Sequence, residues 1–365
     1  MKILIIAPYH VSGTLDLWQR ELGKRGHECR YVTLFKNPWG FAEDICLDLP
    51  LMPTQGSPLI PLRRFLHRIT RGPLADDTPI TETPPFWKSP SSIATAFFAL
   101  RDSVIAPRVN AAVADYGLDS FDLYWLDQGA EFFRDGRNVK RWASEKKRLM
   151  AFYHGSDMRN RGIYPQVDKH LALRLSSEVD LLELDDRMKY LFLPFDTAKL
   201  TPEDRTPVDD GTVRIAHAAR VRSFKGTDRI IEVVENLKKK HPVELVLIEN
   251  MTHQQAMEAK KRCDIAVDQI ADTGGWGYGM SSLEYLSLGI PTCTSMVPEM
   301  VDFLPDHPFV AVTPETLEAE LEKLIVDARL RQKVGKAGRK WVVKYHDIAN
   351  VTDQLIGYFS DLGWS

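Results

Sequence analysis

The alternation of short apolar runs with amphipathic segments is the feature of this sequence that most constrains its fold. Residues 3–7 form a continuous apolar run, the pattern of a strand that is covered on both faces of its sheet. An amphipathic segment follows at 15–25, with apolar residues spaced by three and four, and a second strand is predicted at 29–34. A strand, a helix and a strand in this order predict a parallel sheet.

The first half of the chain continues this pattern around an irregular insertion. Prolines are dense between residues 37 and 90, which predicts surface loops without regular structure. The elements expected after the insertion are a helix at 91–116, strands at 121–126 and 149–153, and two further segments at 181–184 and 190–193.

The second half holds a more regular alternation. The expected strands are 213–219, 243–248, 264–268 and 292–295, and the expected helices are 227–239, 254–262, 281–288, 315–326 and 328–345. The length of 365 residues exceeds what one core usually sustains. The sequence therefore predicts an α/β chain of two facing, Rossmann-like, doubly wound domains, 1–195 and 196–345, with a deep ligand cleft between them.

Composition and charge exclude several classes of function. Lys and Arg number 47 against 50 Asp and Glu, so a dedicated nucleic-acid-binding protein is disfavoured and no nucleic-acid partner is expected. The four cysteines show no CxxC spacing, which argues against a disulfide framework or a zinc ribbon and favours a reducing, cytoplasmic setting. The amino-terminal apolar run is too short for a signal peptide, and no stretch approaches the roughly 20 apolar residues of a spanning helix.

Basic and apolar residues interleave at 61–71, within the insertion. One interpretation is contact with an anionic membrane surface, at its inner face, or with an acidic acceptor. The other is a solvated face packed by its own apolar residues, and we favour this second interpretation because a run of charges is usually just solvated.

A glycine-rich segment, 274–279, opens directly into the helix predicted at 281–288. The free N–H groups and the positive dipole end of such a helix suit a phosphate, and glycine lets a ligand approach the backbone closely. Glu284 lies in the first turn among apolar neighbours, where a buried carboxylate needs a partner, and a ligand hydroxyl is one candidate. The alternative is an ordinary glutamate at the start of a helix.

Two further signals follow predicted strands. Arg220 and Lys225 lie between the strand at 213–219 and the next helix, where the two cations could hold a diphosphate or simply form a solvated basic turn. His154 follows the strand at 149–153, which places it at the ligand edge of the first sheet as a structural or a functional histidine.

Together these residues resemble the retaining family 4 glycosyltransferases of GT-B fold. The chain matches the family's Arg…Lys-Gly pair, although Ala219 stands where glycine is usual, and it matches a (Phe/Tyr)-Gly…Glu…Gly-x-Pro segment at 278–291. The resemblance implies catalytic roles for His154, Arg220 and Lys225, with His154 close to the transferred sugar and Glu284 on the nucleotide ribose. The remaining residues that it assigns to the nucleotide-sugar are Gly13, Tyr278, Gly279, Met280 and Ser281. A final helix at 348–359, within 346–365, is expected to pack back on the first domain.

One departure from the family concerns the donor sugar. The family's first glutamate stands eight positions before the second, and here that position holds Trp276. An aromatic ring cannot accept hydrogen bonds from sugar hydroxyls as a carboxylate does. Asp268, Gln269 and Asp272 are the nearby candidates to replace it.

The predicted function is transfer of a hexose-type sugar from a nucleotide-diphosphate sugar to a glycan, glycolipid or other carbohydrate acceptor, as in polysaccharide biosynthesis. No Asp-x-Asp pair occurs, so the sequence predicts neither a metal nor a cofactor. Two alternatives stay open, a nucleotide-sugar epimerase of the same fold and a non-catalytic nucleotide-sugar-binding protein. A nicotinamide-dependent dehydrogenase is disfavoured because residues 8–14 lack G-x-G-x-x-G.

Overall fold

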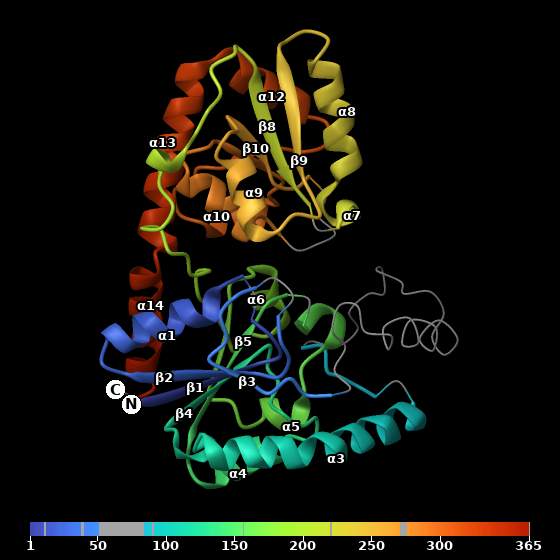
Figure 1. Ribbon diagram of the computed structural model, residues 1–365, viewed down its shortest axis with the longest axis vertical. Helices are drawn as coiled ribbons and strands as arrows, with labels where there is room; N and C mark the ends of the chain where they lie inside the picture. Colours follow the sequence, from blue (N-terminus) through green and yellow to red (C-terminus); the bar gives the residue numbers. More distant parts are fainter. Residues whose placement is uncertain are drawn as a thin grey trace. The chain divides into compact units, whose positions relative to one another are not determined.

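The computed structural model describes residues 1–10, 12–37, 40–50, 84–89, 91–155, 157–219, 221–270 and 276–364. The chain divides into two compact units, Met1–Leu191 with Gln354–Ser365, and Phe192–Asp353. Each unit is a parallel sheet covered by helices (Figure 1). The segment 61–71, Arg220 and Asp272 lie outside the described residues.

The first unit is built on seven parallel strands in the order β3-β2-β1-β4-β5-β6-β7. Their bounds are β1 (Lys2–Ala7), β2 (Glu28–Thr33), β3 (Ile45–Cys46), β4 (Leu123–Asp127), β5 (Arg148–Tyr153), β6 (Leu173–Ser176) and β7 (Met188–Tyr190). The strands predicted at 3–7, 29–34, 121–126 and 149–153 correspond to β1, β2, β4 and β5. Strand β6 was missed because Arg174, which pairs with the buried Asp168 at 2.7 Å, interrupts its apolar pattern.

The helices of the first unit are α1 (Thr14–Lys24), α3 (Ser92–Asp115), α4 (Arg137–Ser144), α5 (Pro165–Asp168) and α6 (Asp180–Leu184). Segment 181–184 is therefore helical and does not extend the sheet. The last helix, α14 (Ile348–Asp361), begins in the second unit and ends in the first, where Tyr358 donates a hydrogen bond to the carbonyl oxygen of Tyr190 at 2.7 Å.

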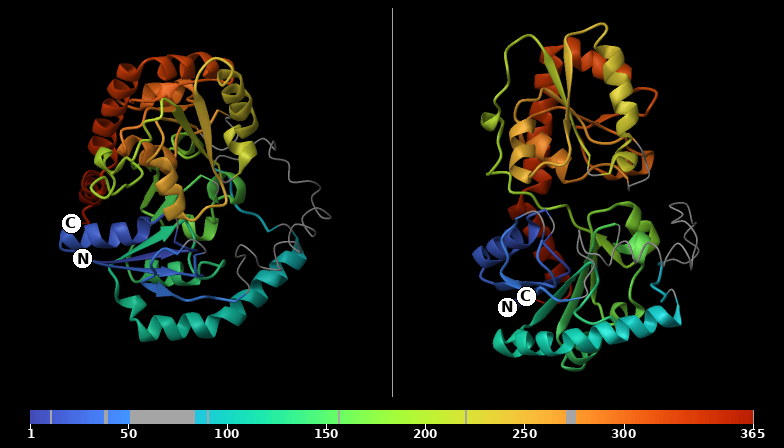
Figure 2. Two further views of the ribbon diagram at one scale, coloured as in Figure 1. Left: turned by 45° about the horizontal axis from the view of Figure 1, so that its top comes forward. Right: turned by 45° about the vertical axis from the view of Figure 1, so that its right-hand side comes forward.

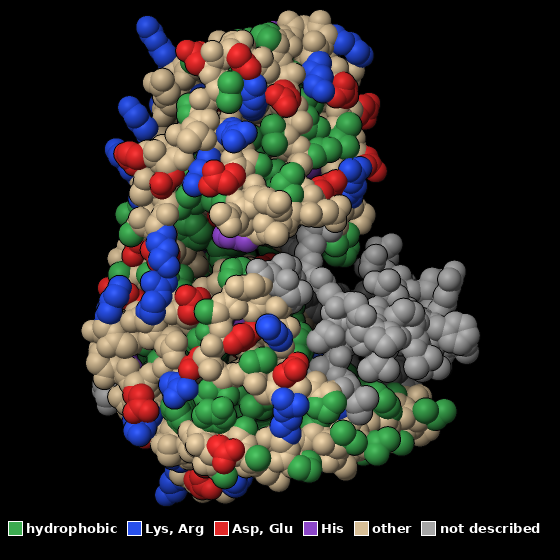
Figure 3. Space-filling model, viewed as in Figure 1, with side chains coloured by type: hydrophobic (Ala, Val, Ile, Leu, Met, Phe, Trp, Pro, Cys, Tyr) green, Lys and Arg blue, Asp and Glu red, His purple; other side chains and the backbone are tan. Residues whose placement is uncertain are grey.

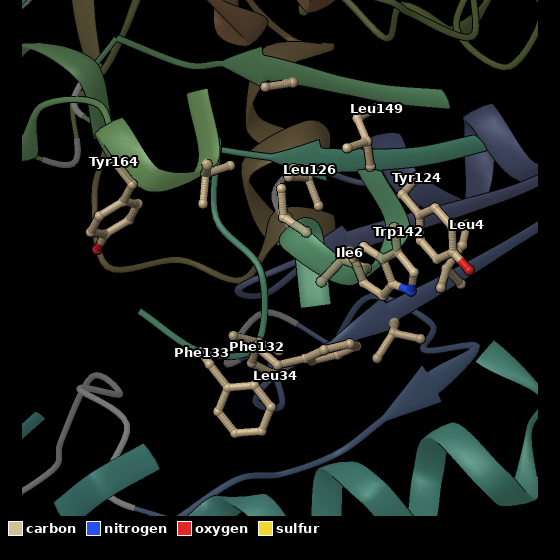
Figure 4. Close-up of a cluster of buried hydrophobic side chains, with 14 of the residues drawn as sticks. Leu4, Ile6, Leu34, Tyr124, Leu126, Phe132, Phe133, Trp142, Leu149 and Tyr164 are labelled. Atoms are coloured by element: carbon tan, nitrogen blue, oxygen red, sulfur yellow. The ribbon is translucent and has the colours of Figure 1, made fainter. Parts of the chain in front are cut away.

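The core of the first unit is rich in aromatic side chains. The ring of Trp142 from α4 stacks on that of Tyr124 from β4 with centroids 3.8 Å apart, and Leu4 of β1 lies beside them (Figure 4). The Trp142 indole N–H donates to Asp119 at 3.1 Å, so the one polar atom of this buried ring is satisfied.

Helix α3 has two different faces. Its inner face contributes Ile105 and Val109 to the core, whereas apolar side chains follow its exposed face (Figure 3). The largest exposed fractions there belong to Ile93 at 81% and Leu100 at 60%.

The second unit has five parallel strands in the order β12-β11-β10-β8-β9. The strands are β8 (Val213–Ala218), β9 (Val243–Ile248), β10 (Ile265–Val267), β11 (Thr292–Thr294) and β12 (Val310–Ala311). The helices are α7 (Arg222–Lys225), α8 (Thr227–Leu237), α9 (His253–Lys260), α10 (Met280–Ser287), α11 (Pro298–Phe303), α12 (Leu317–Val326) and α13 (Ala328–His346). The predicted strands and helices of this half correspond to these elements within a few residues.

Helices flank the second sheet on both sides (Figure 2), so its strands contribute side chains to a separate core on each face. Ile215 of β8 joins the core under α8 and α12, whereas the next residue, Ala216, faces Tyr285 of α10 in a second core. No helix in the described ranges is long and apolar enough to cross a membrane.

Two glycines let α13 pack closely against the turn that follows α10. A Cβ on Gly335 would collide with the carbonyl oxygen of Gly289, and a Cβ on Gly338 would lie 2.7 Å from Leu286 Cδ2. The Gly289 backbone cannot move aside as a flexible side chain could, so position 335 requires glycine.

We predict that Gly335→Ala lowers the free energy of unfolding by about 3 kcal/mol, since overpacking is added without any gain in burial. The matched control is Gly357→Ala, at an exposed position of α14 with open space around it. This control should be neutral or stabilise the protein by up to about 1 kcal/mol through helix propensity. Chemical denaturation measures both, and equal effects of the two substitutions would contradict the packing argument.

Candidate active site

The carboxyl ends of β4 and β5 bring Asp127 and His154 together. The two strands pair in parallel with Asp127 opposite Phe152, so the residue that ends β4 lies beside the one that follows β5. His154 Nε2 is 2.7 Å from Asp127 Oδ1, and the two side chains are 25% and 7% exposed. The sequence predicted His154 at this edge and missed Asp127, although its place at the end of a predicted strand was a usable signal.

The loop after His154 is fixed by its own hydrogen bonds. The His154 backbone N–H donates to both carboxylate oxygens of Asp157 at 3.0 Å. A π-helical turn, Asp157–Arg161, follows, and Arg159 in it pairs with Glu178 at 2.8 Å. Gly155 has φ +78°, a left-handed conformation that favours glycine, and a Cβ there would displace the Arg159 guanidinium.

His154 is a charged histidine at neutral pH. Burial of the ring opposes protonation, but the carboxylates of Asp127, Asp157 and Glu178 favour the imidazolium more strongly and raise the pKa of His154 to about 9. With Nε2–H directed at Asp127, the imidazolium has a second donor at Nδ1.

A histidine whose pKa is higher in the folded than in the unfolded state stabilises the folded protein fully at pH values below its unfolded-state pKa, near 6.5. This contribution to the free energy of unfolding is lost as the pH rises through 9. We therefore predict that the free energy of unfolding falls by roughly 3 kcal/mol between pH 6.5 and 9. Asp127→Asn should flatten this decline and lower the pKa of the His154 ring measured by NMR. An unchanged ring pKa in Asp127→Asn would contradict the assignment.

In the second unit, Lys225 and Asp268 meet at the carboxyl ends of β8 and β10. Lys225 Nζ lies 2.6 Å from Asp268 Oδ1 and 3.2 Å from Gln269 Oε1. The Asp268 side chain is 0% exposed, and its second oxygen accepts from Ser282 Oγ at 2.6 Å. Burial acts to raise the pKa of Asp268, but the Lys225 ammonium outweighs it and holds that pKa below its ordinary value.

Asp268 thus joins α7, the end of β10 and the start of α10 through one carboxylate. The backbone N–H of Gly279, which precedes α10, also points to Asp268 Oδ2 at 3.4 Å. Four residues that the sequence singled out separately, Lys225, Asp268, Gln269 and Gly279, therefore belong to one cluster. Met280 and Ser281 follow in the first turn of α10.

Tyr278 is anchored within the second unit. His346 donates from Nδ1 to the carbonyl oxygen of Leu193 at 2.7 Å, so its Nε2 accepts a hydrogen bond from the Tyr278 hydroxyl at 2.9 Å. Burial lowers the pKa of His346 to about 3, so the ring stays neutral and keeps these roles. Trp276, two residues earlier, is partly buried.

Glu284 has protein partners on both carboxylate oxygens. Lys260 of α9 forms an ion pair with Oε2, and His253 Nε2 lies 3.1 Å from Oε1. The side chains of Glu284 and Lys260 are 9% and 3% exposed, and Lys260 also donates to Ser281 Oγ at 2.9 Å. Burial acts to raise the pKa of Glu284, but Lys260 and His253 bring it below its ordinary value.

The sequence argument that Glu284 needs a partner was sound, but the structure supplies Lys260 without any ligand. Lys260 was missed because it opens a basic run, Lys260-Lys261-Arg262, that looks solvated. Its helical spacing was the available signal, since Ala256 and Met257, one turn earlier, pack on the core.

We predict that Lys260→Met lowers the free energy of unfolding by about 3–5 kcal/mol, because it leaves the Glu284 carboxylate buried and without its cation. Lys261→Met is the matched control, since Lys261 pairs with Glu258, whose side chain is 54% exposed. That control should change stability by less than about 1 kcal/mol. Urea denaturation checks the difference, and a Lys260→Met protein as stable as the control would contradict it.

Gly13 is the residue before α1, at the end of the loop that follows β1. Its φ is +69°, and a Cβ there would meet Phe41 at 3.3 Å. Among the residues with described positions, no group of three or more His, Cys, Asp or Glu side chains could hold a metal ion.

No protein-family model and no curated protein sequence matches the chain. Solved structures match it over its whole length. An alpha-glucosyltransferase in complex with UDP and a 13-mer DNA shares 9% sequence identity, with a TM-score of 0.60 over 99% of this chain and 100% of that one. A glycosyltransferase from Rickettsia africae shares 13% identity, with a TM-score of 0.57 over 100% and 99%.

The chain has the GT-B fold. This fold is not restricted to sugar transfer among the matching structures. A candidate UDP-N-acetylglucosamine 2-epimerase from Listeria monocytogenes matches with 12% identity and a TM-score of 0.53 over 100% of this chain and 97% of that one. Identities this low carry the fold alone, so the reaction must be argued from the residues.

Proposed function

We propose that this protein is a glycosyltransferase that uses a nucleotide-diphosphate sugar as donor. The observation that carries the proposal is the cluster of Lys225, Asp268 and the first turn of α10 at the strand ends of the second GT-B unit. Ligands of open parallel sheets bind beyond these strand ends. A structure of the same fold has UDP bound.

The donor diphosphate would lie against Lys225 and the N–H groups of Gly279, Met280 and Ser281. As the bond between sugar and phosphate breaks, negative charge grows on the leaving diphosphate, and fixed positive groups at that point lower the barrier. Arg220, which the family resemblance places on the same diphosphate, would add a guanidinium. Asp268 keeps Lys225 positioned rather than free to rotate.

The ribose would lie against Glu284, with Lys260 holding the carboxylate ionised and oriented. Each carboxylate oxygen keeps a further lone pair, so a pair of ribose hydroxyls can still donate to it. Trp276 stands where the family has its sugar-binding glutamate. We propose Gln269 for the donor-sugar contact, since its Oε1 lies 3.2 Å from Lys225 Nζ, beside the proposed diphosphate contact, whereas the Asp268 side chain is 0% exposed.

In the first unit, His154 would contribute its Nδ1–H to the transferred sugar or to a developing negative charge. Its charge is fixed by Asp127, so it acts as a donor and not as a base at neutral pH. Retention of configuration and independence from metal are parts of the proposal that rest on the family resemblance. The acceptor would be a glycan or a glycolipid.

An epimerase is the second candidate, since one matching structure carries that description. Trp276 does not distinguish the two reactions, since it only removes the carboxylate that contacts the donor sugar in the family pattern. The two reactions differ in whether they require an acceptor. A glycosyltransferase does, whereas an epimerase forms its product without one.

We predict that UDP or another nucleotide diphosphate raises the melting temperature of the wild-type protein. A ligand at about 100 times its dissociation constant adds roughly 2.7 kcal/mol of stability. The variant Arg220→Ala/Lys225→Ala should lose the shift, whereas Arg222→Ala should keep it. Arg222 lies in the same turn but is 50% exposed and pairs with Glu249 at 2.7 Å.

The outcome that would reject the proposal is no shift with any nucleotide or sugar nucleotide. An equal shift in wild type and the double variant would reject the assigned site.

A further inference from the structure

The first unit contains an arginine enclosed by aromatic rings, outside the residues assigned so far. The Arg134 guanidinium lies over the ring of Phe98 at 3.7 Å, of Trp87 at 5.2 Å and of Tyr164 at 6.0 Å. These rings come from the residues 84–89, from α3 and from the residue before α5, and the Trp87 and Tyr164 rings contact each other at 5.3 Å. Three separate parts of the chain therefore converge on one cation.

The segment that carries Trp87 is fixed in place. The Trp87 backbone N–H donates to the carbonyl oxygen of Ile163 at 2.8 Å, and the Ile163 backbone N–H donates to the carbonyl oxygen of Pro85 at 2.8 Å. A Cβ on Gly162 would lie 2.8 Å from both Pro85 O and Trp87 N, so only glycine permits this approach.

The Arg134 charge has no carboxylate partner among the residues described. Its Nε is buried without a hydrogen-bond acceptor, and burial lowers the pKa of the guanidinium to about 10. Asp102, an acid whose charge acts on Arg134, is paired with Arg101, which donates to it from Nε at 2.9 Å, and its other oxygen accepts the Arg134 backbone N–H at 3.1 Å. Burying a charge without a partner costs stability unless a ligand supplies the counter-charge.

A second guanidinium, Arg161, belongs to the same cluster of rings. It stacks over the Tyr164 ring at 4.7 Å and donates to the carbonyl oxygens of Gln128 and Gly162. Those acceptors are neutral, so its charge is also uncompensated within the described ranges. Gln128 directly follows Asp127, and Arg161 ends the π-helical turn that begins at Asp157, which places this cluster next to His154.

We propose that Arg134 and Arg161, with the rings of Trp87 and Tyr164, bind an anionic group of the acceptor, either a phosphate or a carboxylate. This proposal rests on the proposed function, since it names the substrate class that enters the first unit. A guanidinium binds either anion with two hydrogen bonds, and an aromatic face packs against the apolar face of a sugar ring.

The experiment uses the full chain in the Arg220→Ala/Lys225→Ala background, so that phosphate cannot bind at the proposed diphosphate site. Inorganic phosphate, glucuronate and uncharged glucose are titrated at constant ionic strength and followed by tryptophan fluorescence and calorimetry. Saturable binding of phosphate or glucuronate, at least tenfold weaker for Arg134→Met and with no such binding of glucose, is the expected result. Phosphate alone would indicate a phosphorylated acceptor, and glucuronate alone a uronic acid.

The matched control is Arg137→Met. Arg137 also stacks on an aromatic ring, Phe133 at 4.4 Å, but it is paired with Asp135 at 2.8 Å, so its loss should leave anion binding unchanged. If Arg134→Met does not fold, Arg161→Met and Trp87→Leu replace it, with the same tenfold loss expected.

Absence of saturable anion binding, or an equal loss in Arg137→Met, would overturn the proposal. Neither outcome depends on nucleotide binding, which is measured separately with the wild-type chain, so failure of the donor site and failure of this site are distinguishable.

Discussion

Parallel strand pairing is the constraint on which the rest of this structure depends. It brings the carboxyl ends of all strands in a sheet to one edge, and the polar residues that follow those strands must find partners there. Asp127 with His154, and Asp268 with Lys225, are the two results, one in each unit. In both pairs a nearly buried carboxylate fixes a cation, so the charge at each edge has a defined position and direction.

The charge clusters differ in whether the protein itself balances them. Glu284 and Asp268 have lysine partners, and both carboxyls are held below their ordinary pKa against the effect of burial. Arg134 instead lies among rings, without a carboxylate in the described ranges. A compensated pair holds its charge in one position before any ligand binds, whereas the charge of Arg134 has no counter-charge among the described residues until a ligand supplies one. This contrast separates the scaffold of the proposed donor site from the proposed acceptor contact.

Close contacts at glycines hold the helices and turns that carry these charged residues. Helix α10, which begins at the proposed diphosphate site, is backed by α13 through Gly335 and Gly338, where side chains would not fit. In the first unit, Gly162 lets the backbone at Pro85 and Trp87 approach the end of the π-helical turn in the same way. The loops of the candidate site are thus held both by their own hydrogen bonds and by the packing of the elements beneath them.

The sequence by itself determined the α/β class, most strands and helices of the second unit (not α7, α11 or β12), and His154, Lys225, Gly279 and Glu284 as residues of interest, because periodicity and glycine placement are local signals. It missed strand β6, where buried Arg174 breaks the apolar pattern. It also missed Asp127 and Lys260, which lie 27 and 24 residues from their partners His154 and Glu284. It missed Arg134 as well, whose neighbouring rings belong to residues more than 29 positions away. Only the tertiary structure decided those partnerships, since a charge acquires its partner through strand order and helix packing, which no local pattern encodes.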